Sequence, residues 1–260
     1  MKIINLSDEH EKLFIHCLED WSDDMKESGE HRTCWVKKMK NHGLGVKLAL
    51  DDNGQVGGMI QYIPIEYSLA EGRDLYFIPC IWVHGHKEGR GNFQKKGMGK
   101  ALLQTAEEDV QKRGAKGLVA WGLSLPFWMK ASWYKKRGYK KVDKMGMQVL
   151  LWKPFEKDAE SPKWIRPRKK PERIPGKVVV SAFVSGVCSV GGINYERAKN
   201  AAASFGEEVE FQGFDTSDRE VFREWGLQDA VFIDGKNITT GPPLTYDKML
   251  KKIAKRVKRL

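Results

Sequence analysis

The sequence has few cysteines and no long apolar run. Its 260 residues include four cysteines, which form no Cys-x-x-Cys pair and no spacing with histidine that would indicate zinc. This scattered distribution of cysteines argues against a disulfide framework and predicts a reducing, cytoplasmic location. It also predicts no metal site. No apolar stretch approaches the length of a membrane span, and the N-terminus lacks the apolar core of a signal peptide. We therefore expect no membrane partner.

Acidic residues are scarce in two stretches, whose charges of +6 and +7 together exceed the net charge of +11. Residues 163–177 hold seven lysines or arginines against one glutamate, and residues 248–260 hold seven and no acid. Pro162 precedes the first stretch and three prolines lie within it, which makes this part of the chain extended and semi-rigid. The composition predicts a basic linker at 159–176 between a domain at 1–158 and a smaller domain at 177–260.

A predicted strand at 75–83 is followed by a glycine turn, Gln94-Lys95-Lys96-Gly97-Met98-Gly99, that opens a helix at Lys100. The N–H groups at a helix start lack intrahelical partners, and the helix dipole favours negative charge there. Glycines let the backbone approach a bulky ligand, and the three lysines add positive charge. This combination predicts a ligand that carries phosphate, and a diphosphate in particular.

Two common phosphate motifs do not fit this turn. A Rossmann fingerprint needs a third glycine where Leu102 stands, and a Walker loop needs glycine at Gln94 and Ser or Thr at Ala101. The remaining pattern, Gln-x-x-Gly-x-Gly at a helix start, resembles the pyrophosphate loop of GNAT-family N-acetyltransferases. A plain strand-to-helix turn is the alternative interpretation.

Two further features carry the same resemblance. Trp133-Tyr134-Lys135-Lys136-Arg137-Gly138-Tyr139, whose tyrosine follows Gly99 by 35 residues, resembles the aromatic-Tyr-x-x-x-Gly-aromatic run of the family. Pro79 cannot donate to a sheet ladder, so its strand needs a bulge or a gap, and in GNAT folds this strand is bulged and splays from its neighbour. The resemblance covers roughly residues 1–155 and implies an α/β fold with a mixed central sheet flanked by helices.

The resemblance implies that acetyl-CoA is the co-substrate and that an amine of a small molecule or peptide attacks it directly in a ternary complex. Tyr134 would give a proton to the leaving thiolate, or hydrogen-bond it; a buried packing role is the alternative. Backbone groups of a central strand would hold the pantetheine arm, and the glycine turn would hold the diphosphate. The implied cofactor-binding residues are Ile81, Trp82, Val83, Gln94, Lys95, Lys96, Gly97, Met98, Gly99 and Lys100.

The general base and the acceptor pocket stay open. No carboxylate stands on the central strand, and Glu66, Asp74 and His84 are the candidates for the base. His84 and His86 are alternatively two solvated loop histidines. A helical pattern runs from Glu9 to about Met25, and a second from Thr33 to Asn41. The tryptophans that belong either to the acceptor pocket or to the core are Trp21, Trp35, Trp82 and Trp128.

Residues 177–260 follow a β-α-β-α-β-β-α order, with the first helix expected from about Asn194, and resemble a thioredoxin-like domain. The whole chain then resembles the GNAT proteins that carry a YoaP-like C-terminal domain. Cys188 stands where the first thiol of a Cys-x-x-Cys motif would be, but the second position is Gly191. Asp229 and Ala230 replace the proline that precedes the late strand. A binding or docking module is therefore expected in place of redox chemistry, although a reactive Cys188 stays open.

The C-terminal helix offers two interpretations. Leu250, Ile253, Ala254 and Val257 repeat at helical spacing among lysines and arginines. This pattern favours a helix packed on the sheet, whereas nucleic acid or anionic lipid is an alternative that it does not favour. A second hypothesis is a non-catalytic CoA-binding regulatory module that acts through the thioredoxin-like domain and the basic tail. A dimer stays open, and the sequence does not identify the acceptor amine.

Overall fold

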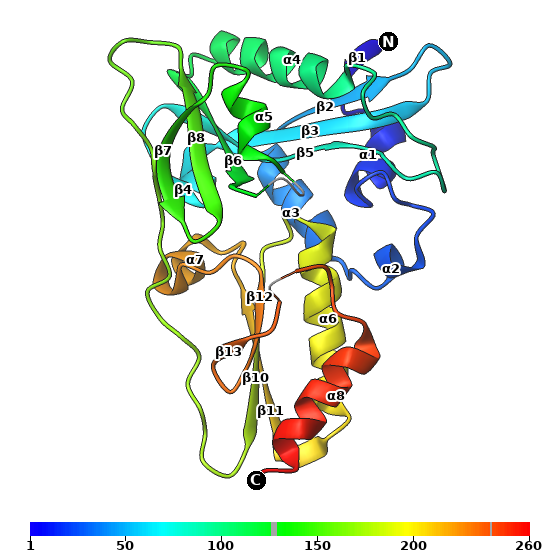
Figure 1. Cartoon of the computed structure of the whole chain (residues 1–260), viewed down its shortest axis with the longest axis vertical. Helices are drawn as coiled ribbons and strands as arrows, with labels where there is room; N and C mark the ends of the chain where they lie inside the picture. Colours follow the sequence, from blue (N-terminus) through cyan, green and yellow to red (C-terminus); the bar gives the residue numbers. More distant parts are fainter. Residues whose placement is uncertain (126–128, 240) are drawn as a thin grey trace. The chain divides into compact units, whose positions relative to one another are not determined.

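The computed structural model describes residues 1–125, 129–239 and 241–260 and forms two compact units (Figure 1). The first unit contains residues 1–19 and 38–165, and the second contains 20–37 and 166–260. Residues 20–37 thus group with the second unit, although the sequence prediction places them in the first domain. Within the described ranges, no helix has both the length and the apolar character needed to span a membrane.

The first unit is built on a seven-stranded mixed sheet, as predicted. Only one neighbouring pair, β5 and β6, is parallel; every other pair is antiparallel. A separate two-stranded ribbon joins β4 (Ala70–Glu71) to β9 (Lys163–Trp164). The strands in spatial order are β1 (Lys2–Asn5), β2 (Gly45–Leu50), β3 (Val56–Pro64), β5 (Leu75–Val83), β6 (Gly117–Leu123), β8 (Gln148–Pro154) and β7 (Lys140–Met145).

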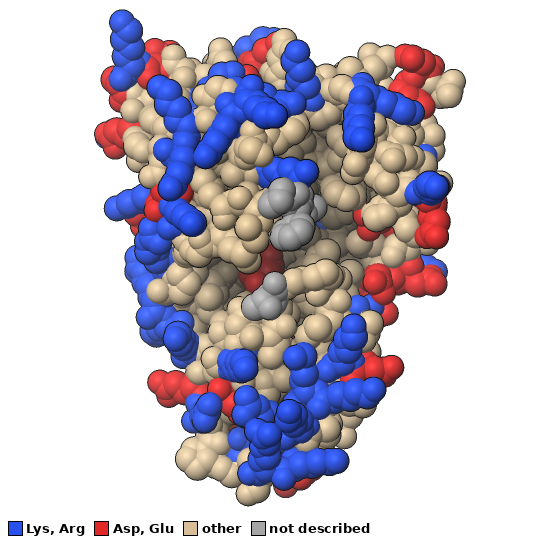
Figure 2. All heavy atoms as spheres, viewed as in Figure 1, with Lys and Arg blue, Asp and Glu red and all other residues tan. Residues whose placement is uncertain are grey.

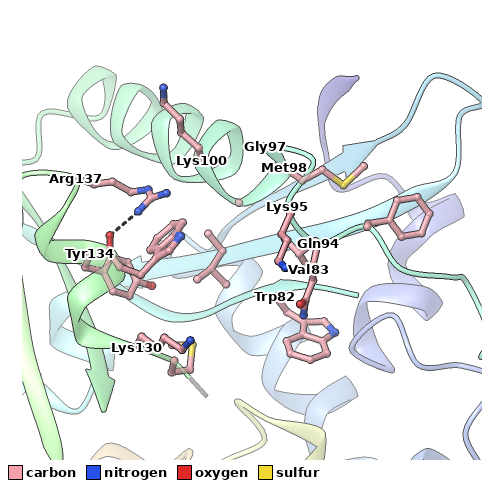
Figure 3. A pocket seen from close by; sticks show the side chains of 15 residues that line it. Trp82, Val83, Gln94, Lys95, Gly97, Met98, Lys100, Lys130, Tyr134 and Arg137 are labelled. Carbon is pink, nitrogen blue, oxygen red and sulfur yellow. Dashed lines mark hydrogen bonds between the residues drawn. The ribbon is translucent and has the colours of Figure 1, made fainter. Parts of the chain in front are cut away.

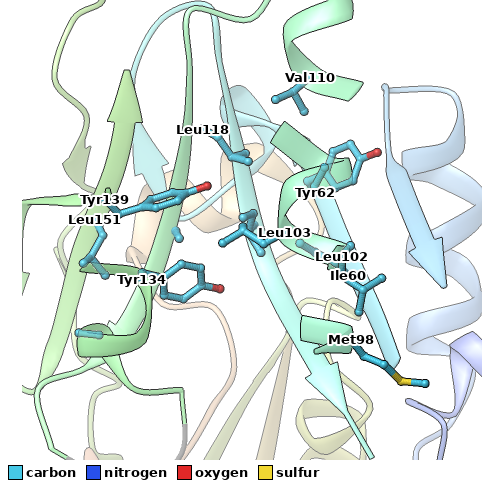
Figure 4. Close-up of a cluster of buried hydrophobic side chains, with 14 of the residues drawn as sticks. Ile60, Tyr62, Met98, Leu102, Leu103, Val110, Leu118, Tyr134, Tyr139 and Leu151 are labelled. Atoms are coloured by element: carbon cyan, nitrogen blue, oxygen red, sulfur yellow. The ribbon is translucent and has the colours of Figure 1, made fainter. Parts of the chain in front are cut away.

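Two helices, α4 (Met98–Lys112) and α5 (Ala131–Lys135), pack on one face of this sheet (Figure 1). Apolar residues recur along α4 at spacings of three and four, so they form one stripe. That stripe, which includes Leu102, Leu103 and Val110, is buried against residues of the sheet such as Ile60 and Leu118 (Figure 4). The position of both helices is therefore set by burial of apolar surface.

The prediction of one helix from Glu9 to about Met25 is wrong. This segment instead contains two helices, α1 (Asp8–Ile15) and the short α2 (Asp23–Lys26). Cys17 and Leu18, between them, have φ values of 53° and 64°, in the left-handed region that a continuous helix cannot contain. The next helix, α3 (His31–Lys40), lies close to its predicted position.

The second unit contains a four-stranded sheet in the order β11-β10-β12-β13, with β10 parallel to β11 and antiparallel to β12. The predicted β-α-β-α-β-β-α order is found, but its first helix begins at Ser189, about five residues earlier than expected. The elements are β10 (Val178–Val184), α6 (Ser189–Ala203), β11 (Val209–Asp215), α7 (Arg219–Trp225), β12 (Ala230–Ile233), β13 (Lys236–Asn237) and α8 (Tyr246–Val257).

Residues 20–37 join the second unit through contacts with α6. Arg197 is 5% exposed and donates hydrogen bonds of 2.6 Å to both Asp24 and Glu27. At Gly192 an added Cβ would lie 2.2 Å from the carbonyl oxygen of Ser28, so only glycine allows this approach of the two backbones. The contacts combine charge pairing with close backbone packing, which explains why this early segment groups with the late part of the chain.

The Asp229 carboxyl group occupies the space beside Gly191. It accepts hydrogen bonds from the backbone N–H of Ser185 at 2.8 Å and from the Ser185 hydroxyl at 3.0 Å. A Cβ at position 191 would lie 2.6 Å from this carboxyl group. The position of the second thiol in a Cys-x-x-Cys motif therefore has no room for a side chain. Burial raises the pKa of Asp229 to about 6, and the hydrogen bonds from Ser185 and the charge of His31 oppose the increase.

The buried carboxyl group predicts a pH-dependent stability. The pKa of Asp229 in the folded chain lies above its ordinary value of 3.8. Its contribution to the free energy of unfolding is therefore complete below pH 3.8 and is lost as the pH rises to about 6. The loss is about 3 kcal/mol. We expect the free energy of unfolding of Asp229→Asn, relative to the unchanged protein, to rise by this amount between about pH 4 and about pH 7. Calorimetric unfolding of both full-length chains measures it, and parallel pH curves would contradict it.

Candidate active site

The two central strands of the first unit pair over only half their length. Their parallel register begins at Leu75 with Gly117 and ends at Ile78 with Ala120, although both strands continue for several residues. Pro79 stands where the pairing stops and has no N–H to donate. The sheet therefore opens between β5 and β6, as the sequence predicts.

A bulge on the other edge of β5 accompanies this opening. Ile78 and Pro79 together face the single residue Tyr62 of β3, because the register shifts between Gln61 and Ile63. On the side of β6, the Trp121 indole N–H donates a hydrogen bond of 2.8 Å to the carbonyl oxygen of Pro79. This bond fixes the point at which the strands diverge. Beyond it, β5 pairs only with β3 within the described part of the chain.

The glycine turn brings the start of α4 to this opening. Gly97 is the N-cap residue with φ 85°, a left-handed conformation that favours glycine. The first intrahelical bond runs from the Ala101 N–H to the Gly97 carbonyl at 3.1 Å, so the N–H groups of Met98, Gly99 and Lys100 precede the helical ladder. The first turn of α4 contains no acidic residue. Its positive dipole is therefore not neutralised locally.

A pocket of about 550 Å³ lies between the opened strand β5, the start of α4 and α5 (Figure 3). Nine of the ten predicted cofactor-binding residues and Tyr134 line it. Lys96 is the exception: its ammonium group lies 5.2 Å from the centre of the Phe93 ring and outside the lining. The lining residues absent from the prediction are Phe93, Met129, Lys130, Trp133 and Arg137.

Four cations line the pocket. Lys95, Lys100, Lys130 and Arg137 belong to its lining, and no Asp or Glu is found among the described residues that line it. The Arg137 guanidinium group stacks on the Trp133 ring, 3.7 Å from its centre, and donates a hydrogen bond of 2.6 Å to the Trp133 carbonyl. Burial lowers the pKa of Arg137, which nevertheless stays charged near neutral pH. The site suits an anion with several charges.

Tyr134 supplies a proton donor to the same pocket. Its side chain is 1% exposed, and its hydroxyl group has no hydrogen-bond partner among the described residues. Burial, followed by the nearby Cys80 thiol, raises the pKa of this hydroxyl far above its ordinary value. The phenol is therefore protonated near neutral pH. A buried hydroxyl without a partner that lines a pocket is suited to bonding a ligand atom.

Arg137 lies beyond the end of α5, in the turn that follows Lys135, so helical spacing does not predict its place in the pocket. The place of Trp133 depends on how α5 packs against α4, where an added Cβ at Gly99 would lie 3.4 Å from its ring. That contact has no signal in the local sequence pattern.

The sequence candidates for a general base do not line this pocket. His84 is fully buried, and its Nδ1 donates to the Gly91 carbonyl at 2.7 Å, so it is not the solvated loop histidine of the alternative interpretation. His86 lies beside Trp82 and 3.6 Å from Glu19. Glu66 and Asp74 are exposed. Within the described residues, no three His, Cys, Asp or Glu side chains gather as a metal site.

The tryptophans proposed for the acceptor pocket belong to different units. Trp82 lines the described pocket, whereas Trp21 and Trp35 belong to the second unit. Trp128 lies outside the residues that the structure describes.

This chain is similar to known proteins in sequence and in structure. Among solved structures, the paia N-acetyltransferase from Thermoplasma acidophilum in complex with coenzyme A is 19% identical, covers 60% of this chain and 100% of its own, and has a TM-score of 0.41. A GNAT family acetyltransferase from Brucella melitensis in complex with acetyl-CoA is 17% identical, covers 61% and 90%, and has a TM-score of 0.41. Curated proteins give no match. A model of the acetyltransferase (GNAT) family matches residues 6–139, more than half of the sequence. The chain belongs to this family and is an acyltransferase of the GNAT type.

Proposed function

We propose that this protein transfers the acetyl group of acetyl-CoA to an amine of a small molecule or peptide. The observation that carries the proposal is the pocket at the β5–β6 opening, which gathers four cations, a helix start and the Tyr134 hydroxyl. Its volume lies within the range of small-molecule sites. Family membership favours this enzymatic role over the regulatory CoA-binding module.

The cationic side of the pocket fits the phosphates of acetyl-CoA. The N–H groups at the start of α4 can donate to a diphosphate, and Lys95, Lys100 and Arg137 supply charge-assisted hydrogen bonds. Lys96 lies outside the lining, so we assign it only a long-range electrostatic contribution. A ligand with fewer negative charges would leave several of these cations uncompensated.

The opened edge of β5 fits the pantetheine arm. From Ile81 to Val83 this edge has no partner strand within the described ranges, so the backbone groups that face it can bond a ligand. Ile81, Trp82 and Val83 all line the pocket and could pair with the two amides of the arm as a strand would. A backbone N–H of the same segment would stabilise the oxyanion that forms on the thioester carbonyl.

Tyr134 would act on the leaving group. When the amine nitrogen bonds to the acetyl carbon and the carbon–sulfur bond breaks, the Tyr134 hydroxyl gives the thiolate sulfur its proton or a hydrogen bond. The surplus proton of the amine passes to a base that we leave unassigned, because His84, Glu66 and Asp74 do not line the pocket. That proton restores the phenol where its own proton was transferred. Proton transfer from a positioned side chain typically contributes ~10²–10⁴-fold to a rate.

We also propose that the second unit is a thioredoxin-like, YoaP-like domain without redox chemistry. The strand order β11-β10-β12-β13, with the parallel pair followed by an antiparallel hairpin, supports the likeness. The Asp229 carboxyl group beside Gly191 supports the loss of the dithiol. A reducing cytoplasmic location belongs to the same proposal, and the four cysteines, all within the described residues, form no disulfide bond.

Removal of the Tyr134 hydroxyl group tests the catalytic role. Tyr134→Phe should lower the rate of thiol release from acetyl-CoA by ~10²-fold with the best acceptor of an amine panel. Its acetyl-CoA affinity should stay unchanged. Discontinuous assays of thiol release measure the rate, and calorimetric titration measures the affinity.

Tyr139→Phe is the matched control, because Tyr139 is 2% exposed and does not line the pocket. It should keep both the rate and the affinity. Equal rates for the Tyr134→Phe and unchanged proteins would remove the tyrosine from the mechanism while leaving acetyl-CoA binding intact.

Charge removal tests the phosphate subsite. Arg137→Gln should weaken acetyl-CoA binding by about tenfold or more, because a hydrogen bond to a charged group contributes about 1.5–3 kcal/mol. Lys96→Gln removes the same charge outside the pocket and should change the affinity by less than about twofold. Calorimetric titration compares them, and a larger effect at Lys96 would contradict the assignment from the structure.

A further inference from the structure

The last helix, α8, carries a stripe of exposed cations. Because 3.6 residues make one turn, side chains spaced by three, four, seven, ten and eleven residues lie on one side of a helix. Four exposed cations of α8 follow this spacing, and two more stand in the turn directly after Val257. The six together form the α8 stripe: Lys248, Lys251, Lys252, Lys255, Lys258 and Arg259. At 1.5 Å per residue the part from Lys248 to Lys255 is about 10 Å long.

These charged groups do not contribute to the packing of α8 on the second unit. Met249 and Ile253, on the opposite side of α8, are 0% and 1% exposed and attach the helix to the second unit. Within the described part of the chain, none of the six cations takes part in an ion pair or a ring contact. In Figure 2, lysines and arginines gather over the region where Figure 1 places α8. Like charges held this close repel one another, so the stripe lowers the stability of the helix unless an anion covers it.

Further positive charge meets one end of the stripe. Arg256 of α8 lies 3.8 Å from the Asp234 carboxylate, and Arg173 of the basic linker donates to the Asp234 carbonyl oxygen at 3.1 Å. Lys236, two residues further along the chain, is exposed. The linker and the tail, which are far apart in the sequence, therefore meet in this unit.

We propose that the α8 stripe binds the sugar-phosphate backbone of a nucleic acid. The sequence alone does not favour this partner, but the structure adds the exposure of the cations, their lack of ion pairs and the burial of the apolar side. An anionic membrane fits less well, because interfacial helices also insert an apolar face and that face of α8 is buried. Lysines contact phosphates without reading bases, so the binding is independent of sequence.

The number of cations sets the expected salt dependence. Six phosphate contacts to a single strand give a slope of about −4 in log affinity against log salt. Between about 50 and 200 mM salt the affinity should fall by roughly 300-fold. Three contacts would give a slope of about −2 and a fall of roughly 20-fold.

The experiment is a fluorescence anisotropy titration of the full-length protein with a labelled RNA single strand of about 20 nucleotides, at several salt concentrations. The variant Lys251→Gln, Lys255→Gln, Lys258→Gln removes three stripe charges and keeps a residue of similar helix propensity. The control variant Lys112→Gln, Lys135→Gln, Lys140→Gln removes three exposed charges from the first unit, outside the pocket lining. We expect the stripe variant to halve the salt slope and the control to leave it unchanged.

Protection of lysines from amine acylation gives a second readout that needs no variant. RNA should protect Lys248, Lys251, Lys252, Lys255 and Lys258 from the reagent, as measured by mass spectrometry, and leave Lys112 and Lys140 reactive. The proposal would be overturned if the protein did not bind RNA or if the affinity did not change with salt. It would also be overturned if the control variant lost as much of the salt slope as the stripe variant, or if the protein bound only anionic vesicles. None of these outcomes depends on acetyl transfer, which is measured separately by thiol release.

Discussion

The candidate site depends on one missing hydrogen-bond donor in the central sheet. Pro79 interrupts β5 where a regular strand would continue its ladder, and the chain responds with a bulge towards β3 and an end to pairing with β6. Without that interruption, the two strands would close along their full length and leave no edge for a ligand. The helix start at Gly97 then faces an opening that already exists. Backbone geometry, rather than any single reactive side chain, thus creates the pocket.

The parts of the site that the sequence predicted are those encoded locally. A glycine turn before a helix, a proline inside an apolar strand and a tyrosine near a helix end each have a meaning that does not depend on distant contacts. Lys96 shows the limit of this reasoning, because an exposed turn can direct neighbouring lysines to different sides. Trp133 and Lys130 entered the pocket through the packing of α5, which local pattern does not determine.

The second unit shows the same division between local and distant information. The order of its helices and strands follows from hydrophobic periodicity, and the sequence predicted it. The carboxyl group of Asp229 beside Gly191 joins residues 38 positions apart, and only the structure reveals that one fills the space left by the other. The break at Cys17 and Leu18 was missed because neither residue signals a left-handed backbone.

The partners of residues 20–37 also bear on the order in which the chain is synthesised. Protein domains generally fold from the N-terminus while translation continues. Asp24 and Glu27 emerge early, but Arg197, which pairs with both, follows about 170 residues later. The early segment must therefore wait without its charge partner while all strands of the first unit are made. A chain stopped after residue 165 would retain this segment without the surface that orders it. The two units therefore do not correspond to two consecutive segments of the sequence.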